Sequence, residues 1–331
     1  NSVALITASV REHRRTTALG IQAAAQAIGL AIGPFLGSVI SPHLPARFIF
    51  LLSSPLAVLA FFASVLFLPR TRSISPRVRL DYAGSVLLAL AAGGTLGGLT
   101  LAAKVGWSPN VMGMVLFGLV ASIALLGVER HVMRPIFEPR LFRLRHVKVS
   151  IAILVLSYVT FFGLLVAIPF FVTQDFAASA RRAAEATMAI PIGLALVAPL
   201  SGILRRRFGG RNLATTSSSL LALAVTGIAV APNVKVVAGL LILVGCAIGV
   251  LNTTTNSSVM SNIADVDRGL ASGTVNLARA AGSALGMALA TSVVVVLQRS
   301  GATSLRLAVG VLVVSAVAAI VVSVSGMPKD R

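Results

Sequence analysis

Acidic residues are scarce in this sequence, which has nine Asp and Glu against 28 Lys and Arg in 331 residues. Each of the nine falls in an expected loop or at an expected helix end, and none sits in the middle of an apolar segment. They are Glu12, Asp81, Glu129, Glu138, Asp175, Glu185, Asp265, Asp267 and Asp330. Buried acid–base catalysis and a membrane-embedded proton site both need a carboxylate inside such a segment. Neither has a candidate here.

Cysteine, histidine and the common enzyme motifs are also nearly absent. The single cysteine, Cys246, lies in an apolar run, which excludes a disulfide framework and a cysteine-based metal site. The four histidines fall in expected loops and share no ligand spacing. No phosphate loop, nucleophile elbow or HExxH motif is present in the sequence. We therefore expect no enzyme activity, no metal and no cofactor.

What the chain has in excess is apolar sequence. Hydrophobic residues make up 56% of it, charged residues 11%, and the mean hydropathy is +0.95. A soluble domain does not bury that much apolar surface, so the composition predicts an all-α polytopic membrane protein. Asn212 is expected to cap one of its helices. Ten spans are expected at roughly 16–40, 47–68, 81–103, 109–128, 149–173, 182–204, 212–230, 235–257, 268–297 and 304–325.

The formal charge of +19 is divided unequally between the two sets of loops. Loops on the side of Arg11 hold 20 of the 28 basic residues, the opposite loops hold seven, and only Arg279 lies inside a span. By the positive-inside rule, the first loop and the C-terminus are cytoplasmic, and the charge reflects topology rather than nucleic-acid binding. The longest basic loop, 129–148, is either an interfacial helix on anionic lipid or a solvated linker.

The segment 20–38, GIQAAAQAIGLAIGPFLGS, is uncharged but unusually rich in glycine. In a helix, its small and polar residues share an arc of about 80°. These residues are Gln22, Gln26, Gly29, Gly33 and Gly37. Such a face allows close approach of a neighbouring backbone, and Pro34 favours a kink. The alternative interpretation is that this face is an ordinary helix-packing surface, because small residues spaced in this way are common in membrane bundles.

Arg279 is about ten residues into its span, which is a depth of ~15 Å along a helix. A charge at that depth normally faces protein or a water-filled cavity. Arg279 either takes part in substrate binding or proton coupling, or it has a structural role and donates hydrogen bonds to neighbouring carbonyls or to lipid phosphate. Gly282 and Gly286 follow it and predict a helix–helix contact.

Two other spans carry candidate site residues, one of them amides and the other aromatic rings. Amides in a membrane helix either form hydrogen bonds to other helices or line a cavity. Aromatic rings either stack on an apolar or cationic substrate or only pack against other helices. In the span near 235–257, glycines and amides share an arc of about 60°. The residues concerned are Gly245, Gly249, Asn252 and Asn256 in that span, and Tyr158 and Phe162 in the span near 149–173.

Several motifs resemble one family of membrane transporters. The spacing of Gly20, Gly29, Gly33-Pro34 and Gly37 closely resembles the antiporter motif of drug:proton antiporters in the major facilitator superfamily, with Ser38 in place of a final glycine. The segment GILRRRFGGR (202–211) is similar to the superfamily's cytoplasmic loop motif. Gly202, Arg207, Gly209 and Arg211 match that motif, whereas Arg206 replaces its Asp. With LDYAGSVLLALAAGG (80–94), residues 128–143 and residues 269–286, the chain resembles 14-helix members from the end of their fourth helix onward.

This resemblance implies a major facilitator fold with about ten transmembrane helices present and the first four missing. Residues 1–15 would be the end of a preceding helix and a cytoplasmic loop, and 16–68 the last two helices of the N-terminal half. Residues 69–148 would be two extra central helices with cytoplasmic linkers, and 149–331 a six-helix C-terminal half. The cavity-lining candidates are Gln22, Gln26, Tyr158, Phe162, Asn252, Asn256 and Arg279.

The function that the resemblance implies is secondary active export of drugs or other small amphipathic compounds. The compounds would cross the bacterial plasma membrane by alternating access and proton antiport, with the proton gradient as energy source. Because the spans present hold no central acidic residue, either the proton-binding carboxylate lies in the missing helices, which we favour, or the protein is not proton-coupled. The expected partners are membrane lipid and a hydrophobic or cationic substrate, with no nucleic acid and no prediction of oligomeric state. The alternatives are a dedicated exporter of one metabolite, antibiotic or lipid, and a non-transporting remnant of the same fold.

Overall fold

A computed structural model describes residues 45, 47–67, 82–106, 108–129, 144–260, 268–301 and 304–326 of the chain, together with seven isolated helical positions. Those positions are Ala18, Gln22, Ala25, Ile28, Gly29, Ile32 and Gly33. They fall within the first expected span, 16–40, of which the remainder lies outside the described residues. All regular secondary structure in the described ranges is helical, as the composition predicts.

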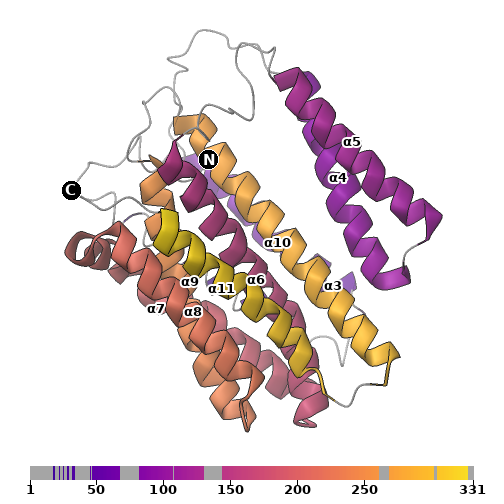
Figure 1. Cartoon of the computed structure of the whole chain (residues 1–331), viewed down its shortest axis with the longest axis vertical. Helices are drawn as coiled ribbons and strands as arrows, with labels where there is room; N and C mark the ends of the chain where they lie inside the picture. The colour runs from indigo at the N-terminus through magenta and orange to yellow at the C-terminus, as the bar shows by residue number, and fades with distance from the viewer. Residues whose placement is uncertain are drawn as a thin grey trace.

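Nine helices lie within the continuous described ranges (Figure 1). Their ends agree with the expected spans from the second onward to within four residues. The helices are α3 (Arg47–Phe67), α4 (Tyr82–Val105), α5 (Pro109–Glu129), α6 (Arg145–Asp175), α7 (Ala180–Phe208), α8 (Gly210–Ala229), α9 (Val234–Met260), α10 (Arg268–Arg299) and α11 (Arg306–Gly326).

Seven of the described helices are long and apolar enough to cross a membrane. Helix α7 makes an eighth if its two parts, which meet at 54° next to Pro199, form one span. Proline lacks the N–H that would continue the helical hydrogen-bond ladder, which explains a bend there. The apolar helix within α3 runs only from Ser53 to Phe67 and is shorter than a typical span.

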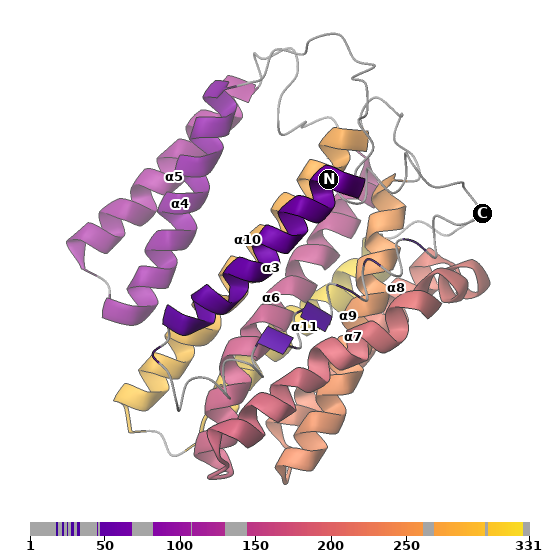
Figure 2. The same ribbon diagram turned by 180° about the vertical axis from the view of Figure 1, so that it is seen from behind.

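Helices α6 to α11 pack into one bundle around a shared apolar core. Within it, α6 contacts α10 and α11, and α9 contacts α7 and α8. The pair α4–α5 lies beside this bundle and reaches it through α10, as Figures 1 and 2 show from opposite sides. The domain boundaries expected from the sequence stay predictions.

Glycines hold three helix pairs at backbone contact. A Cβ atom on Gly245 of α9 would lie within bonding range of the Ile190 carbonyl oxygen of α7, and one on Gly118 of α5 would strike the backbone of α4. A Cβ on Gly286 of α10 would meet the Val159 carbonyl oxygen of α6. These contacts confirm the helix–helix contact predicted for α10. Small residues act here as they do in other membrane bundles, by letting backbones approach.

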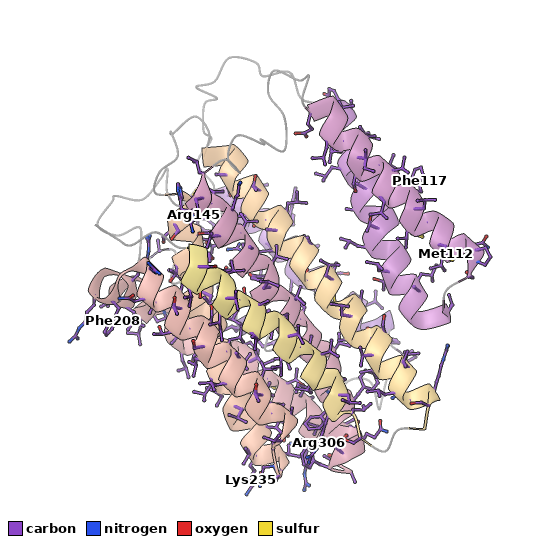
Figure 3. All side chains as sticks on the ribbon, in the orientation of Figure 1. Met112, Phe117, Arg145, Phe208, Lys235 and Arg306 are labelled. Carbon is purple, nitrogen blue, oxygen red and sulfur yellow. The ribbon has the colours of Figure 1, made fainter. Side chains whose placement is uncertain are left out.

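Basic residues lie at both ends of the bundle, and Figure 3 labels residues at each. Arg145 and Phe208 lie at one end, whereas Lys235 and Arg306 lie at the other. We call the first the basic end, because the arginine-rich segment that runs from Arg205 through the α7–α8 junction lies there. The arrangement agrees with the alternation of basic loops in the sequence.

The helix cap predicted at Asn212 is wrong. Helix α8 begins two residues earlier, at Gly210, and its cap is Gly209 with φ of 77°. A left-handed φ suits glycine, which has no Cβ to clash, and it lets α7 end and α8 begin within a single residue. Asn212 therefore sits inside the first turn of α8.

Candidate functional site

Polar side chains from three helices meet where α6, α9 and α10 come together, with Asn276 exposed and the others half-buried. Tyr158 comes from α6, Asn252 from α9, and Asn276 and Arg279 from α10; we call these four residues the polar cluster. Asn252 Nδ2 donates to Tyr158 Oη at 3.1 Å, and Arg279 Nη2 donates to Asn252 Oδ1 at 2.8 Å. Arg279 Nη1 donates to Asn276 Oδ1 at 3.3 Å, and the guanidinium carbon lies 5.9 Å from the centre of the Tyr158 ring.

The cluster lies well inside the expected membrane span. Arg279 is 11 residues from the start of α10, and Asn252 is eight residues from the end of α9. At ~1.5 Å per residue these separations put the cluster roughly 12–17 Å from the basic end. A network that joins three helices at this depth has the position of a ligand site in a helical bundle.

The guanidinium of Arg279 contacts only neutral groups in the described part of the chain. It takes part in none of the ion pairs formed there, and its hydrogen bonds go to two amide oxygens. Its Nε atom is buried and has no hydrogen-bond partner. A charge at this depth in a membrane helix normally has a counter-ion, and the described residues supply none for the half-buried Arg279.

Aromatic rings extend the cluster along α6. The Tyr158 and Phe162 rings stack at 5.9 Å with an interplanar angle of 29°, and Phe161 packs edge-on to Phe162 at 4.8 Å. The structure thus brings together Tyr158, Phe162, Asn252 and Arg279 of the predicted cavity-lining residues. Asn256 lies one turn beyond Asn252, half-buried and without a side-chain hydrogen bond to the described residues.

An apolar layer separates the polar cluster from the basic end. Its members come from the same three helices, and each lies nearer the basic end than Tyr158, Asn252 or Arg279 on its own helix. Tyr158 packs directly against this layer. The layer consists of Val147, Ile151, Leu154, Val259, Ala271, Val275 and Ala278. Between α6, α9 and α10, this apolar layer therefore lies between the polar cluster and the basic end.

Two glycines set the distance between Arg279 and α6. A Cβ on Gly282 would lie 2.7 Å from the Val155 carbonyl oxygen and 2.8 Å from Tyr158 Cβ, and Gly286 makes a similar contact one turn on. On the far side of Asn252, Thr253 accepts a 2.9 Å hydrogen bond from Ser201 of α7. Sequence reasoning missed this hydroxyl pair, because single Ser and Thr residues in apolar helices give no distinctive signal.

Part of the glycine-rich segment 20–38 faces α6 and α7 across a cavity of about 410 Å³. Gly29 and Gly33 line it together with side chains of both helices, among them Pro169 and Thr187. A Cβ on either glycine would meet no described atom within 4 Å, so neither glycine forms a close backbone contact with the described residues. Gln22 is half-buried. Gly20, Gln26, Pro34 and Gly37 lie outside the described residues.

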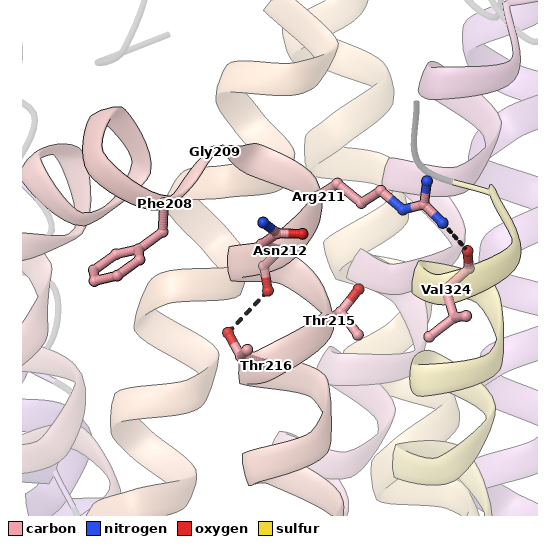
Figure 4. Close-up of a pocket in the computed structure, with 7 residues that line it drawn as sticks. All are labelled: Phe208, Gly209, Arg211, Asn212, Thr215, Thr216 and Val324. Carbon is pink, nitrogen blue, oxygen red and sulfur yellow. Dashed lines mark hydrogen bonds between the residues drawn. The ribbon is translucent and has the colours of Figure 1, made fainter. Parts of the chain in front are cut away.

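The loop-like motif 202–211 lies at the junction of α7 and α8 at the basic end. Gly202 is inside α7, and the Arg207 guanidinium lies 5.7 Å from the centre of the Phe208 ring. Gly209 and Arg211 line a pocket of about 640 Å³ (Figure 4). The remaining lining residues are Phe208, Asn212, Thr215, Thr216 and Val324.

Arginines at the basic end hold the last turn of α11. Arg211 Nη2 donates to the Val324 carbonyl oxygen at 3.0 Å, as Figure 4 shows, and Arg145 Nη2 donates to the Ser325 carbonyl oxygen at 2.7 Å. Carbonyls in the last turn of a helix lack intrahelical partners and attract cations. Sequence reasoning did not predict these contacts, because the partners are more than 100 residues apart.

A comparison with protein-family models matches this chain to the Major Facilitator Superfamily over residues 1–80, 82–287 and 150–325. Curated relatives include the riboflavin transporter RibZ of Clostridioides difficile, 24% identical over 284 residues, which are 85% of this chain and 61% of the relative. The multidrug resistance protein Stp of Mycobacterium tuberculosis is 27% identical over 304 residues, 88% of this chain and 55% of the relative.

A third relative, the cephamycin export protein CmcT of Amycolatopsis lactamdurans, is 32% identical over 311 residues, 88% of this chain and 62% of the relative. The chain thus spans a little over half the length of these relatives. All three are named for transport or resistance rather than for an enzyme activity. The family match covers more than half of the chain and agrees with its apolar helices. This multi-pass membrane protein therefore belongs to the Major Facilitator Superfamily.

Proposed function

We propose that this protein exports drugs or other small amphipathic compounds across the bacterial plasma membrane by proton antiport and alternating access. The observation that carries the proposal is the polar cluster with its adjoining aromatic rings, which lies at mid-membrane depth where α6, α9 and α10 meet. Relatives named for multidrug and puromycin resistance support a drug-like substrate. We also propose that the segment 20–38 is the antiporter motif and that the protein has the 14-helix architecture.

The substrate class follows from the side chains of the site. Tyr158 and Phe162 offer stacked rings to a hydrophobic compound. We expected a hydrophobic or a cationic substrate from the sequence, and the hydrophobic part of that expectation fits these rings. A cationic group at the polar cluster would meet the charge of Arg279, which no described carboxylate offsets. We therefore keep a hydrophobic substrate and place any cationic group away from the cluster.

Export of a single compound is the second candidate function. It is favoured by the 32% identity with a relative named for export of one antibiotic class. A dedicated exporter and a multidrug exporter would share the fold, the site and the coupling mechanism, and they differ only in substrate range.

The orientation in the proposal places the basic end and the C-terminus in the cytoplasm. Arg145 and the arginines near 205–211 lie at that end, in agreement with the positive-inside rule. The apolar layer then separates the polar cluster from the cytoplasm between α6, α9 and α10.

The experiment that tests the proposal is drug-dependent proton movement in inside-out vesicles from cells that express the gene product. Addition of a transported compound should release protons from the vesicle lumen, and a broad panel of cationic and neutral compounds defines the range. A response to a single compound supports the dedicated exporter. No response to any compound, with the protein correctly inserted, rejects both.

A further inference from the structure

We infer that Arg279 binds an acidic group of the transported compound, so that the transporter prefers anionic amphipathic molecules such as aromatic carboxylates. This inference rests on the proposed export function and adds the charge of the substrate to it. It assigns to Arg279 a direct contact with substrate at the polar cluster.

The first argument is charge balance. Every hydrogen bond that Arg279 makes in the described structure goes to a neutral amide oxygen, and none of the ion pairs there includes it. A guanidinium that is removed from water loses hydration energy, which amide oxygens replace less well than an anion does. An anionic ligand therefore gains more at this position than a neutral ligand of the same shape.

The second argument is the number of free donors. A guanidinium has five N–H groups in a planar fork, and the two hydrogen bonds described use one N–H on each Nη atom. The Nε atom is buried, so an incoming anion cannot reach it directly. The second N–H of each Nη atom takes part in no described hydrogen bond, and a carboxylate can accept charge-assisted hydrogen bonds from such groups. Arg279 thus retains donors for a carboxylate.

The third argument is how the cluster orients Arg279. The Asn252 side chain donates to the Tyr158 hydroxyl and so presents its carbonyl oxygen to the guanidinium. The Tyr158 ring lies 5.9 Å from the guanidinium carbon, and Gly282 keeps α10 in contact with α6 beside it. An arginine fixed in this way loses little further conformational entropy when it binds a ligand.

The fourth argument is the position of the aromatic rings. Phe162 stacks on Tyr158 one turn further along α6, so a compound whose acid contacts Arg279 can lay an aromatic or aliphatic body against these rings. The site therefore fits a molecule with one acidic group and a hydrophobic body.

The test uses three probes of the same size that differ only in charge: 2-naphthoate, the neutral 2-naphthamide and the cationic 2-naphthamidine. Their affinities for the purified protein in detergent are measured by isothermal titration calorimetry. The variants are Arg279→Gln, which removes the charge, and Arg279→Lys, which keeps the charge without the fork. Arg299→Gln is the matched control, because it makes the same change at an exposed position of the same helix.

The wild-type protein should bind naphthoate about tenfold or more tightly than naphthamide, which corresponds to one charge-assisted hydrogen-bond pair, and naphthamidine should bind most weakly. Arg279→Gln should remove the preference for naphthoate, Arg279→Lys should keep part of it, and Arg299→Gln should keep all of it. If Arg279→Gln fails to fold, the order of the three probes in the wild type and in Arg279→Lys still decides.

Equal affinity for naphthoate and naphthamide in the wild type overturns the inference, as does a preference that persists in Arg279→Gln. Failure of the wild type to bind any of the probes overturns it as well. Proton movement driven by neutral compounds in vesicles is measured separately. If that coupling is intact while the charge preference is absent, only this inference fails and the proposed export function stands.

Discussion

Replacing Asn252 with Leu should both destabilise the bundle and impair transport, because this amide is the only described link between Tyr158 and the guanidinium of Arg279 by hydrogen bonds. The substitution is close to isosteric and keeps α9 helical, so its effect reports on the two lost bonds. It leaves the Tyr158 hydroxyl without a donor and Arg279 Nη2 without an acceptor.

The size of the effect follows from the two bonds. A hydrogen bond to a charged group contributes ~1.5–3 kcal/mol, and a neutral bond between membrane helices contributes ~0.6 kcal/mol. Leucine recovers part of this through burial of its methyl groups. We therefore expect Asn252→Leu to lower the free energy of unfolding by about 1–3 kcal/mol. Removing the neutral bond alone, with Tyr158→Phe, should cost about 0.6 kcal/mol.

Asn256→Leu is the matched control, because Asn256 lies one turn further on the same helix, is also half-buried, and makes no side-chain hydrogen bond to the described residues. Unfolding is followed by circular dichroism in detergent with increasing dodecyl sulfate, and transport by drug-dependent proton movement in vesicles. Asn252→Leu should be clearly less stable than Asn256→Leu. Equal stabilities of the two variants would refute the reasoning that the cluster is an energetically coupled network.

Three further substitutions test other contacts. Gly282→Ala should destabilise the protein by about 1–3 kcal/mol through overpacking, whereas Gly273→Ala, whose added Cβ meets nothing within 4 Å, should be tolerated in the same unfolding assay. Gly33→Leu should abolish transport without preventing membrane insertion, because it obstructs the cavity of about 410 Å³; active vesicles would contradict this. Arg211→Ala should lower stability by about 1 kcal/mol, since the Val324 carbonyl loses its donor, and an unchanged unfolding midpoint would show that the contact contributes nothing.

Helix positions were predictable from this sequence because the bilayer imposes a length and a composition on each span. The expected boundaries of α4 and α5 differ from the observed ones by at most two residues. The prediction failed at Asn212, where a rule based on side-chain caps missed a glycine that ends one helix and starts the next. A glycine with a left-handed φ is hard to predict from sequence here, because glycine is also frequent inside these helices.

Tyr158, Asn252 and Arg279 of the polar cluster could be nominated from the sequence, whereas Asn276 and the contacts among the four residues could not. Asn252 and Arg279 stood out because a polar amide and a charge are costly in an apolar span. Whether Asn252 bonds across helices or faces a cavity was undecidable, because that depends on how α9 and α10 are rotated against α6. The structure shows the bonds, to Tyr158 and to Arg279.

The glycines and the charge of α10 are parts of one feature rather than two. Gly282 and Gly286 follow Arg279 by three and seven residues, which places all three on the same face of the helix. The glycines bring that face into backbone contact with α6, and the contact holds the guanidinium beside the Tyr158 ring. A larger residue at either glycine would separate the helices and move Arg279 away from both Tyr158 and Asn252. The close packing of α10 against α6 therefore fixes the position of the Arg279 guanidinium, whose charge is otherwise costly in a membrane helix.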